Sequence, residues 1–226
     1  DENEVNGCTD PLACNYQEEH NEDDGSCDYC SCIDDLYLEN YTLTVEPYVV
    51  GGIEGLTTYR IYVNMLAEDD FLSSVFGNNN SPLLISTANG FYNDVSAVGA
   101  TADGINAMFI GLVPSLEFDS WATIGIDSSP TPPFTAVSTI ESSNQPWQGS
   151  FISSSPQSGM DVIMDDITGG AWYIVAGTPN GLPSGPEMRT LMMQITANSA
   201  PSGTVNLQVF PNSQGFNQQQ ITFAFD

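Results

Sequence analysis

All five cysteines of this chain lie between residues 8 and 32, in a stretch that is rich in carboxylates and has no lysine or arginine. Residues 1–39 carry 13 of the 29 aspartate and glutamate residues, and the other 16 are spread over residues 40–226. A segment so short and so charged cannot fold on a hydrophobic core alone, and disulfides are the usual substitute. We therefore predict a disulfide-rich acidic module over 1–39 and a separate domain over 40–226.

The charge balance excludes several classes of partner. The chain has two Lys or Arg residues in all and a formal net charge of −27. Binding to nucleic acid or to an anionic membrane surface requires clustered basic residues, so we expect neither. No apolar run reaches the roughly 20 residues that cross a bilayer, so no membrane span is expected. Clustered cysteines in a disulfide framework indicate an oxidising location, and we predict an extracellular or cell-surface protein.

The body of the chain has the two-residue period of β-strands. In "TTYRIYVNM" (57–65) apolar residues such as Ile61 and Val63 alternate with polar ones, and the same pattern recurs in three other segments. Alternate side chains of a strand point to opposite faces, so each segment has a buried and a solvent-facing side. These segments are "YTLTVEP" (41–47), "GTVNLQVF" (203–210) and "QQITFAFD" (219–226). With many Gly and Pro turns between the strands, the pattern predicts an all-β fold, an antiparallel β-sandwich or jelly roll.

Three further segments have a distinct pattern. The segment "AWYIVAG" (171–177) is apolar on both faces, which is typical of a central strand. The segments "EDDFLSSVFG" (68–77) and "GINAMFIGLV" (104–113) favour short helical turns.

The two arginines are Arg60, on the polar side of a predicted strand, and Arg189. With carboxylates in large excess, each is expected to pair with an acidic side chain. The alternative is that one of them anchors an anionic ligand.

The acidic module has the chemistry of a calcium site. Carboxylates at this density repel one another unless a cation neutralises them, and Ca²⁺ prefers six to eight oxygen ligands. Oxygen ligands are offered by Asp10, Asn15, Glu18, Asn21, Asp23 and Asp24. Two alternatives remain: a solvated acidic segment held by disulfides alone, or a zinc site built on the C-x-x-C of Cys27 and Cys30 with His20 nearby.

The module also resembles a known repeat. "GCTDPLACNY" followed by "DDGSC", over residues 7–27, is similar to a short repeat of secreted and surface proteins of marine Bacteroidota. The resemblance implies a small calcium-binding, disulfide-closed unit with Asp10, Asn15, Asp23 and Asp24 as ligand positions. It differs from the usual occurrence in being a single copy.

The resemblance further implies which cysteines pair. Some versions of the repeat lack a cysteine at position 14, which implies Cys8–Cys27 as the core disulfide. Cys14 would then pair with Cys30 or Cys32. Five is an odd number, so one thiol remains free or bonds to another chain.

No motif of a hydrolase, nucleotide-binding protein or metalloprotease is present, and we predict that the chain is not an enzyme. The single histidine, His20, lies in the acidic module, which disfavours Ser-His-Asp and Cys-His chemistry. The one alternative is glycoside hydrolysis by paired carboxylates. Candidate groups are Glu117 with Asp119, Asp161 with Asp165 and Asp166, and Glu68 with Asp69 and Asp70.

The three tryptophans, Trp121, Trp147 and Trp172, have two interpretations. Packing into the core is the first, and a carbohydrate-contacting platform is the second. Much of 40–225, including "TTYRIYVNM" (57–65), "FDSWATIGID" (118–127) and "SGTVNLQVFP" (202–211), resembles an uncharacterised β-rich domain of large secreted marine bacterial proteins. This resemblance implies no catalytic residues.

Together these observations predict an extracellular structural protein. We expect a calcium-stabilised subunit of a surface filament, appendage or adhesive layer that forms a homo-polymer, or binds a surface partner, through strand or arm exchange. The strand predicted over 219–226 suits the addition of a strand to a neighbouring sheet. The alternative is a monomeric carbohydrate-binding or adhesion module that binds a polysaccharide.

Overall fold

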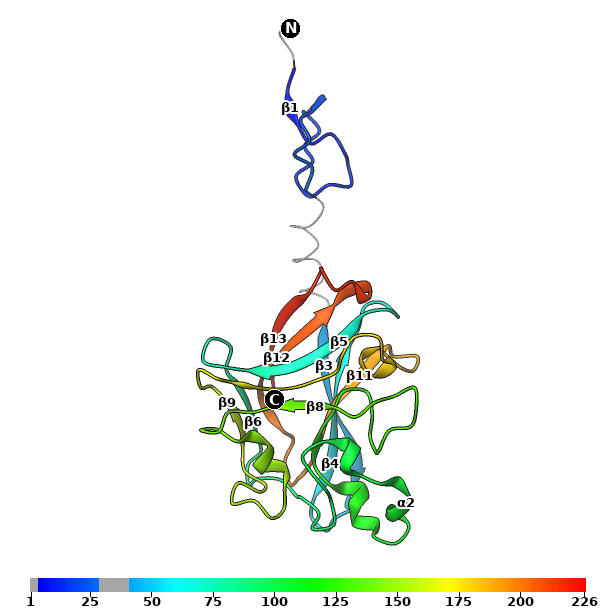
Figure 1. Cartoon of the computed structure of the whole chain (residues 1–226), viewed down its shortest axis with the longest axis vertical. Helices are drawn as coiled ribbons and strands as arrows, with labels where there is room; N and C mark the ends of the chain where they lie inside the picture. Colours follow the sequence, from blue (N-terminus) through cyan, green and yellow to red (C-terminus); the bar gives the residue numbers. More distant parts are fainter. Residues whose placement is uncertain (1–3, 29–40) are drawn as a thin grey trace. The chain divides into compact units, whose positions relative to one another are not determined.

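The computed structural model describes residues 4–28 and 41–226 (Figure 1). The chain divides into two compact units, Asp1–Tyr41 and Thr42–Asp226. This division lies close to the change in composition between residues 39 and 40. Each unit is described by itself below.

The N-terminal unit is a short chain loop closed by a disulfide. Its two strands, β1 (Asn6–Gly7) and β2 (Glu22–Asp23), pair in parallel. Cys8 and Cys27 form a disulfide with a Cα–Cα distance of 4.7 Å. The Cys8 side chain is fully buried, while most of the described residues around it are exposed. The cross-link therefore does in this unit what a hydrophobic core does in a larger one.

The body, Thr42–Asp226, is built almost entirely from strands. They are β3 (Thr42–Val50), β4 (Thr57–Asn64), β5 (Phe71–Gly77), β6 (Leu83–Ser86), β7 (Trp121–Ala122), β8 (Ser138–Ile140), β9 (Val162–Met164), β10 (Gly170–Tyr173), β11 (Arg189–Ala197), β12 (Ser202–Phe210) and β13 (Gln219–Phe225). The helical elements are α2 (Ala107–Ile110) and the 3₁₀ turns η1 (Ala102–Gly104), η2 (Pro114–Phe118), η3 (Trp147–Phe151), η4 (Pro179–Gly181) and η5 (Pro211–Ser213).

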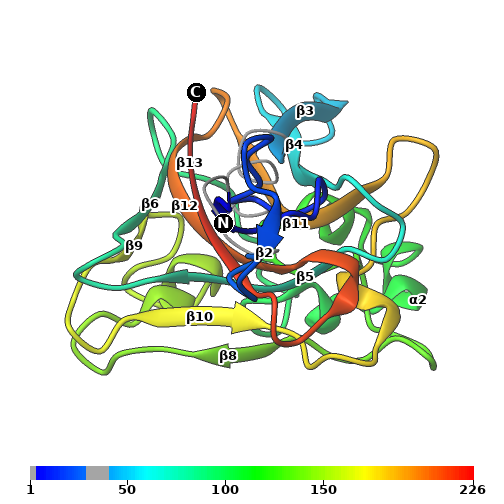
Figure 2. The ribbon, with the colours of Figure 1, turned by 90° about the horizontal axis from the view of Figure 1, so that it is seen from above.

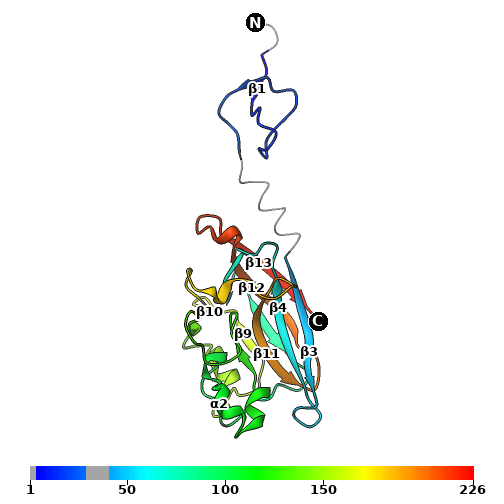
Figure 3. The same ribbon diagram turned by 90° about the vertical axis from the view of Figure 1, so that its right-hand side faces the viewer.

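These strands form two antiparallel sheets. The smaller sheet has the order β3-β4-β11-β7. The larger sheet has the order β8-β10-β5-β12-β6-β9, and β13 pairs with β12. Figure 2 shows β8, β10 and β5 side by side, and in Figure 3 β3 lies on one side of the body and β10 on the other. The predicted all-β fold of packed antiparallel sheets is confirmed.

The core lies between the two sheets and follows the predicted alternation. On β4, Ile61 and Val63 are fully buried while Arg60 and Tyr62 are not. On β12, Leu207 and Val209 are fully buried in the same way. These side chains are buried against apolar side chains of the facing sheet. Removing their apolar surface from water is the main favourable contribution to folding.

Strand β11 is buried on both faces, and the segment that contains η2 lies against its outer face. Gln194 of β11 is fully buried, and its Nε2 donates to the carbonyl oxygens of Glu117 (3.0 Å) and Asp119 (2.8 Å). These two bonds attach the covering segment to the sheet. As a result the outer face of the smaller sheet is exposed on the β3–β4 side and enclosed on the β11–β7 side.

Of the two predicted helical segments, one is correct. Helix α2 lies within 104–113, and Asn106 caps it by accepting a hydrogen bond from the backbone N–H of Met108 at 3.0 Å. The prediction for 68–77 is wrong, because this segment forms β5 between β10 and β12. Pairing on both edges buries Leu72 and Val75 completely, and this tertiary gain outweighs the local preference. The predicted central strand in 171–177 is confirmed as β10, which lies between β8 and β5.

Within residues 4–28 and 41–226, no helix has both the length and the apolar character needed to cross a membrane.

Candidate functional site

Both arginines of the chain lie on the outer face of the smaller sheet, and each has the acidic partner that the sequence predicts. Arg189 of β11 forms a two-point ion pair with Glu46 of β3, with both N–O distances 2.9 Å. Its guanidinium lies 3.9 Å from the centre of the Tyr62 ring. The hydrogen bonds to Glu46 raise the pKa of Arg189, so its guanidinium keeps its positive charge.

Arg60 of β4 is held more loosely. Its Nη2 approaches Asp127 Oδ2 at 3.3 Å, and its Nε donates to Gln194 Oε1 at 3.0 Å. The guanidinium stacks on the Tyr48 ring at 3.8 Å from its centre. The Arg60 side chain is only 13% exposed, whereas that of Asp127 is 54% exposed. One end of this ion pair is therefore fixed by the sheet and the other end is open to solvent.

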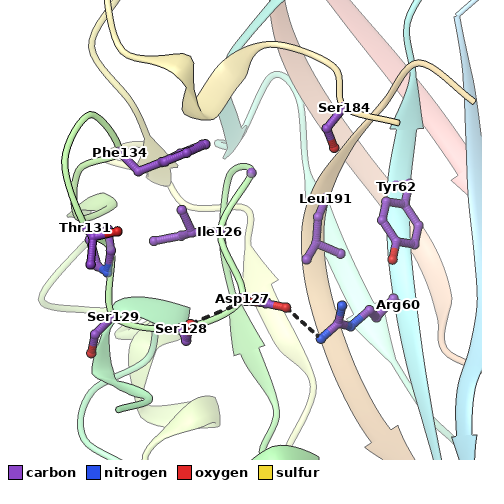
Figure 4. Close-up of a pocket in the computed structure, with 12 residues that line it drawn as sticks. Arg60, Tyr62, Ile126, Asp127, Ser128, Ser129, Thr131, Phe134, Ser184 and Leu191 are labelled. Carbon is purple, nitrogen blue, oxygen red and sulfur yellow. Dashed lines mark hydrogen bonds and ion pairs between the residues drawn. The ribbon is translucent and has the colours of Figure 1, made fainter. Parts of the chain in front are cut away.

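A cavity of about 400 Å³, the Arg60 pocket, opens beside this ion pair (Figure 4). Its walls combine three kinds of side chain: the Arg60–Asp127 ion pair, aromatic and aliphatic groups, and hydroxyl groups. Figure 4 shows Asp127 pointing towards Arg60, with Phe134 and Ile126 on one wall and Tyr62 and Leu191 on the other. The hydroxyl groups come from Ser128, Ser129, Thr131 and Ser184.

The loop that forms one wall of the pocket is fixed from within. Gly125 begins it with φ +69°, and a Cβ there would lie 1.9 Å from the carbonyl oxygen of Asn180, so only glycine fits. Asn180 is fully buried. Its side chain donates to the carbonyl oxygens of Ile124 (3.2 Å) and Thr135 (2.9 Å) and accepts from the Thr135 N–H (3.0 Å). Both ends of the loop are thus attached to one buried amide.

A second cavity of about 390 Å³ shares Arg60, Asp127 and Ser128 with the first. Tyr48, Trp121 and residues of the α2–η2 segment form its other walls. The Arg60–Asp127 pair therefore separates two neighbouring hollows on the same sheet face. Sequence analysis identified Arg60 but not the Arg60 pocket, because the pocket residues come from four separate segments between residues 60 and 191.

The predicted calcium ligands are in the N-terminal unit, where each stabilises a backbone turn. Asp10 Oδ1 accepts the N–H of Leu12 (2.9 Å), Asp23 Oδ1 that of Gly25 (3.1 Å) and Asp24 Oδ1 that of Ser26 (2.9 Å). The bonds from Ser26 hold the pKa of Asp24 below its usual value.

Asn15 bridges the unit, bonding the Ser26 carbonyl (2.7 Å) and the Asp28 N–H (2.8 Å). Among the described residues, no three His, Cys, Asp or Glu side chains are grouped so as to hold a metal ion. Calcium binding at these four positions stays a prediction.

The cysteines are only partly within the described residues. Cys8 and Cys27 form a disulfide, and Cys14 is disulfide-bonded as well. The predicted partners of Cys14, Cys30 and Cys32, lie outside the described residues, as does any unpaired thiol among them. Because Cys27 is in a disulfide, a zinc site that uses the Cys27 thiolate is excluded.

The tryptophans do not form a carbohydrate platform. Trp121, Trp147 and Trp172 are 2%, 2% and 0% exposed. Trp147 and Trp172 pack against each other with ring centres 5.2 Å apart. The indole N–H of Trp172 donates to the carbonyl oxygen of Thr123 at 3.1 Å. All three rings are almost completely buried, Trp121 at the wall of the second cavity, so the carbohydrate platform is wrong and the interpretation as buried packing residues is correct.

Three of the carboxylates considered for glycoside hydrolysis are engaged in local structure. Asp70 is fully buried and accepts the backbone N–H groups of Leu66, Ala67 and Asn212, each at 3.0 Å. Asp166 accepts the Ser142 hydroxyl, which lowers its pKa. Asp165 accepts the Gln145 side chain at 2.7 Å.

Asp119 has a neighbour that the sequence did not indicate. Burial raises the pKa of Asp119 to about 8. Its Oδ1 accepts the backbone N–H of Asp94 at 2.7 Å. Burial also raises the pKa of Asp94, but bonds from Ser115, Ser96 and Tyr92 outweigh it, so this pKa is below its usual value. Neither carboxylate lines the Arg60 pocket or the second cavity beside it, so we interpret the pair as structural.

The edges of the sheets form a second candidate surface. Within the described residues β13 (Gln219–Phe225) pairs with β12 alone, so its other edge has no partner strand. The segment "QQITFAF" has no charge and no proline, and its pairing with β12 has no bulge. The other long edge strand, β3, contains Glu46 and Pro47 and a bulge between Pro47 and Val49. The edges β7, β8 and β9 are three residues long or shorter.

Comparisons with known proteins add no relative: no family model, no curated protein and no solved structure matches the chain.

Proposed function

We propose that this chain is an extracellular structural protein whose copies assemble through β13. The observation that carries the proposal is the contrast between β13 and the other edges of the sandwich. An exposed edge strand is a template for pairing with another chain, and proteins usually block such edges with charges, proline, bulges or short length. Strand β3 has three of these devices, and β7, β8 and β9 are short. Strand β13 has none of them.

Strand β13 is also suited to pairing with a second copy of itself. In an antiparallel pair centred on Thr222, Ile221 lies opposite Phe223 of the other copy, and Gln220 lies opposite Ala224. A β-branched residue opposite an aromatic one is a favourable cross-strand pair. No charged side chain opposes another in this register. Such a contact closes on itself, and we propose that the N-terminal unit then joins pairs into a filament, appendage or adhesive layer.

The net charge makes a clear prediction for this assembly. Two copies of charge −27 repel each other, and the range of this repulsion falls from about 30 Å at 0.01 M salt to about 3 Å at 1 M salt. Strand pairing depends on backbone hydrogen bonds and apolar contacts, which salt does not screen. We therefore expect association to strengthen as salt is added.

The experiment is multi-angle light scattering of the purified chain at 10 mM and 1 M NaCl. We expect a monomer in low salt and a dimer or larger species in high salt. The double substitution Gln220→Lys and Ala224→Lys places lysines opposite each other in the paired register and should keep the chain monomeric. Val95→Lys with Val98→Lys, at positions 87% and 71% exposed, adds the same charge elsewhere and should leave association unchanged.

A monomer at both salt concentrations contradicts the proposal, as does equal association of the two lysine variants. The disulfide and the absence of a membrane-spanning helix among the described residues are consistent with an extracellular location. The resemblance of residues 7–27 to a repeat of secreted surface proteins supports it further. The proposal assigns no enzymatic activity to the chain.

A further inference from the structure

We infer that the Arg60 pocket binds a carboxylate-bearing sugar, with the ligand carboxylate taking the place of Asp127 on Arg60. This inference is independent of the assembly through β13. It follows from the difference between the two arginines and from the chemistry of the pocket walls.

Arg189 has no capacity for a ligand, because Glu46 occupies its guanidinium at two points. Arg60 is different. Asp127 contacts one of its terminal nitrogens at 3.3 Å, and the other, Nη1, makes no hydrogen bond to the described residues. A guanidinium presents two parallel N–H donors to a carboxylate, and the two-point arrangement is the stronger one. The one-point contact between Arg60 and Asp127 is therefore weaker than the two-point contact that the carboxylate of a ligand makes with Arg60.

The geometry allows the exchange. Gln194 and the ring of Tyr48 hold Arg60 in place, so the guanidinium is already positioned before a ligand arrives. Asp127 is half exposed and its neighbour Ser128 contacts its other oxygen at 3.4 Å, so the aspartate can turn into solvent at little cost. A ligand that binds a rigid cation loses less free energy to ordering of the protein.

The rest of the pocket specifies the kind of ligand. Sugars present apolar C–H faces and hydroxyl edges, and pockets that bind them combine aromatic rings with placed polar groups. Phe134 is 39% exposed in the wall of the pocket, and Ser128, Ser129, Thr131 and Ser184 add hydroxyl groups to the lining. A volume of about 400 Å³ is within the range of small-molecule sites. An acidic sugar uses all three groups of the wall, whereas a neutral sugar leaves Arg60 unused.

The test is titration calorimetry of the full chain in 0.15 M NaCl with three probes: a trimer of glucuronic acid, the matching trimer of glucose and sodium acetate. We expect the uronic acid trimer to bind at least ten times more tightly than either of the others. Binding of acetate alone with equal affinity, or binding of the glucose trimer with equal affinity, overturns the inference. No heat with the uronic acid trimer at millimolar concentration overturns it too.

Two variants separate this site from the rest of the surface. Asp127→Asn removes the competing charge and should tighten binding of the uronic acid trimer several-fold without affecting the glucose trimer. Glu46→Gln frees the other arginine, Arg189, and should leave the affinity unchanged. If Asp127→Asn weakens binding or has no effect, Asp127 is not the group that the ligand replaces. The Asp127 side chain is largely exposed, so this variant is expected to fold.

Discussion

Arg189 and Glu46 lie on two strands that are not neighbours, and the arginine reaches across the Tyr62 ring of the strand between them to make its two-point contact. The ion pair thus joins β3, β4 and β11 on the outer face of the smaller sheet. Arg60, on the same face, has a single contact with Asp127 at 3.3 Å.

This contrast predicts unequal effects of two equivalent substitutions. Glu46→Gln leaves a partly buried guanidinium without its charged partner, and we expect the free energy of unfolding to fall by about 1 kcal/mol. Asp127→Asn removes a longer contact with an exposed carboxylate, and a loss of under about 0.5 kcal/mol is expected. Urea denaturation at pH 7 in low salt measures both. Equal losses contradict the distinction between the two arginines.

A second prediction concerns pH and Asp119. Its pKa is about 8 in the folded protein against 3.8 as the ordinary value, so the folded state keeps a proton that the unfolded state has released. The contribution of Asp119 to the free energy of unfolding therefore falls as pH rises from about 4 to about 8 and does not fall further above that range. Asp119→Asn keeps an oxygen that accepts the Asp94 N–H and removes the titration.

We expect the stability of Asp119→Asn relative to the parent to increase over this pH range, by on the order of a few kcal/mol in total. Denaturant titrations at pH 5, 6.5 and 8.5 measure the difference. Asp69→Asn, at an exposed position, is the control and should show no such trend. A pH-independent difference for Asp119→Asn shows that the carboxyl is not protonated in the folded state.

The third prediction concerns the disulfide of the N-terminal unit. Cys8→Ala with Cys27→Ala opens a loop of 19 residues and should cost that unit about 3 kcal/mol. We expect faster cleavage at Glu18, Glu19 and Glu22 by a glutamate-specific protease, which suits a unit without lysine or arginine. The thermal transition of the body, Thr42–Asp226, should not move, since it belongs to a separate compact unit. A lowered transition temperature of the body is the opposite result.

The fourth prediction separates a calcium role from a turn role at Asp23 and Asp24. The pair Asp23→Asn and Asp24→Asn retains the side-chain oxygens that accept the Gly25 and Ser26 N–H groups but removes two charges. We expect calcium affinity, measured by calorimetry, to drop at least tenfold because Ca²⁺ prefers ionised carboxylates. Protease resistance in the presence of a chelator should match the parent. Unchanged calcium affinity, or no binding by the parent, refutes calcium binding at these residues.

The strands that sequence analysis predicted best are those with one buried face and one solvent-exposed face. In β4 and β13 the alternation of apolar and polar residues matches the alternation of buried and exposed side chains. Ile61, Val63 and Ile221 could therefore be assigned to the buried face without knowledge of their neighbours. The same reasoning failed for 68–77, because β5 is covered on both edges by strands nearly a hundred or more residues away, and a central strand needs no alternation. The cap at Asn106 is local, and the helix it begins was predicted correctly.

The sequence by itself determined the all-β class and the acidic module with its disulfide, since these depend on composition and on short-range periodicity. The tertiary structure alone decided that Arg189 is fully engaged by Glu46 while Arg60 is not engaged at both terminal nitrogens. It also decided where the tryptophans lie and that the edge of β13 lacks charges, proline and bulges. These properties depend on contacts between residues far apart in the chain. Arg60 meets Asp127 only because β4 pairs with β11 and the loop after β7 is attached to Asn180. A local sequence pattern does not predict this contact, because the free energy that stabilises it comes from the packing of the whole domain.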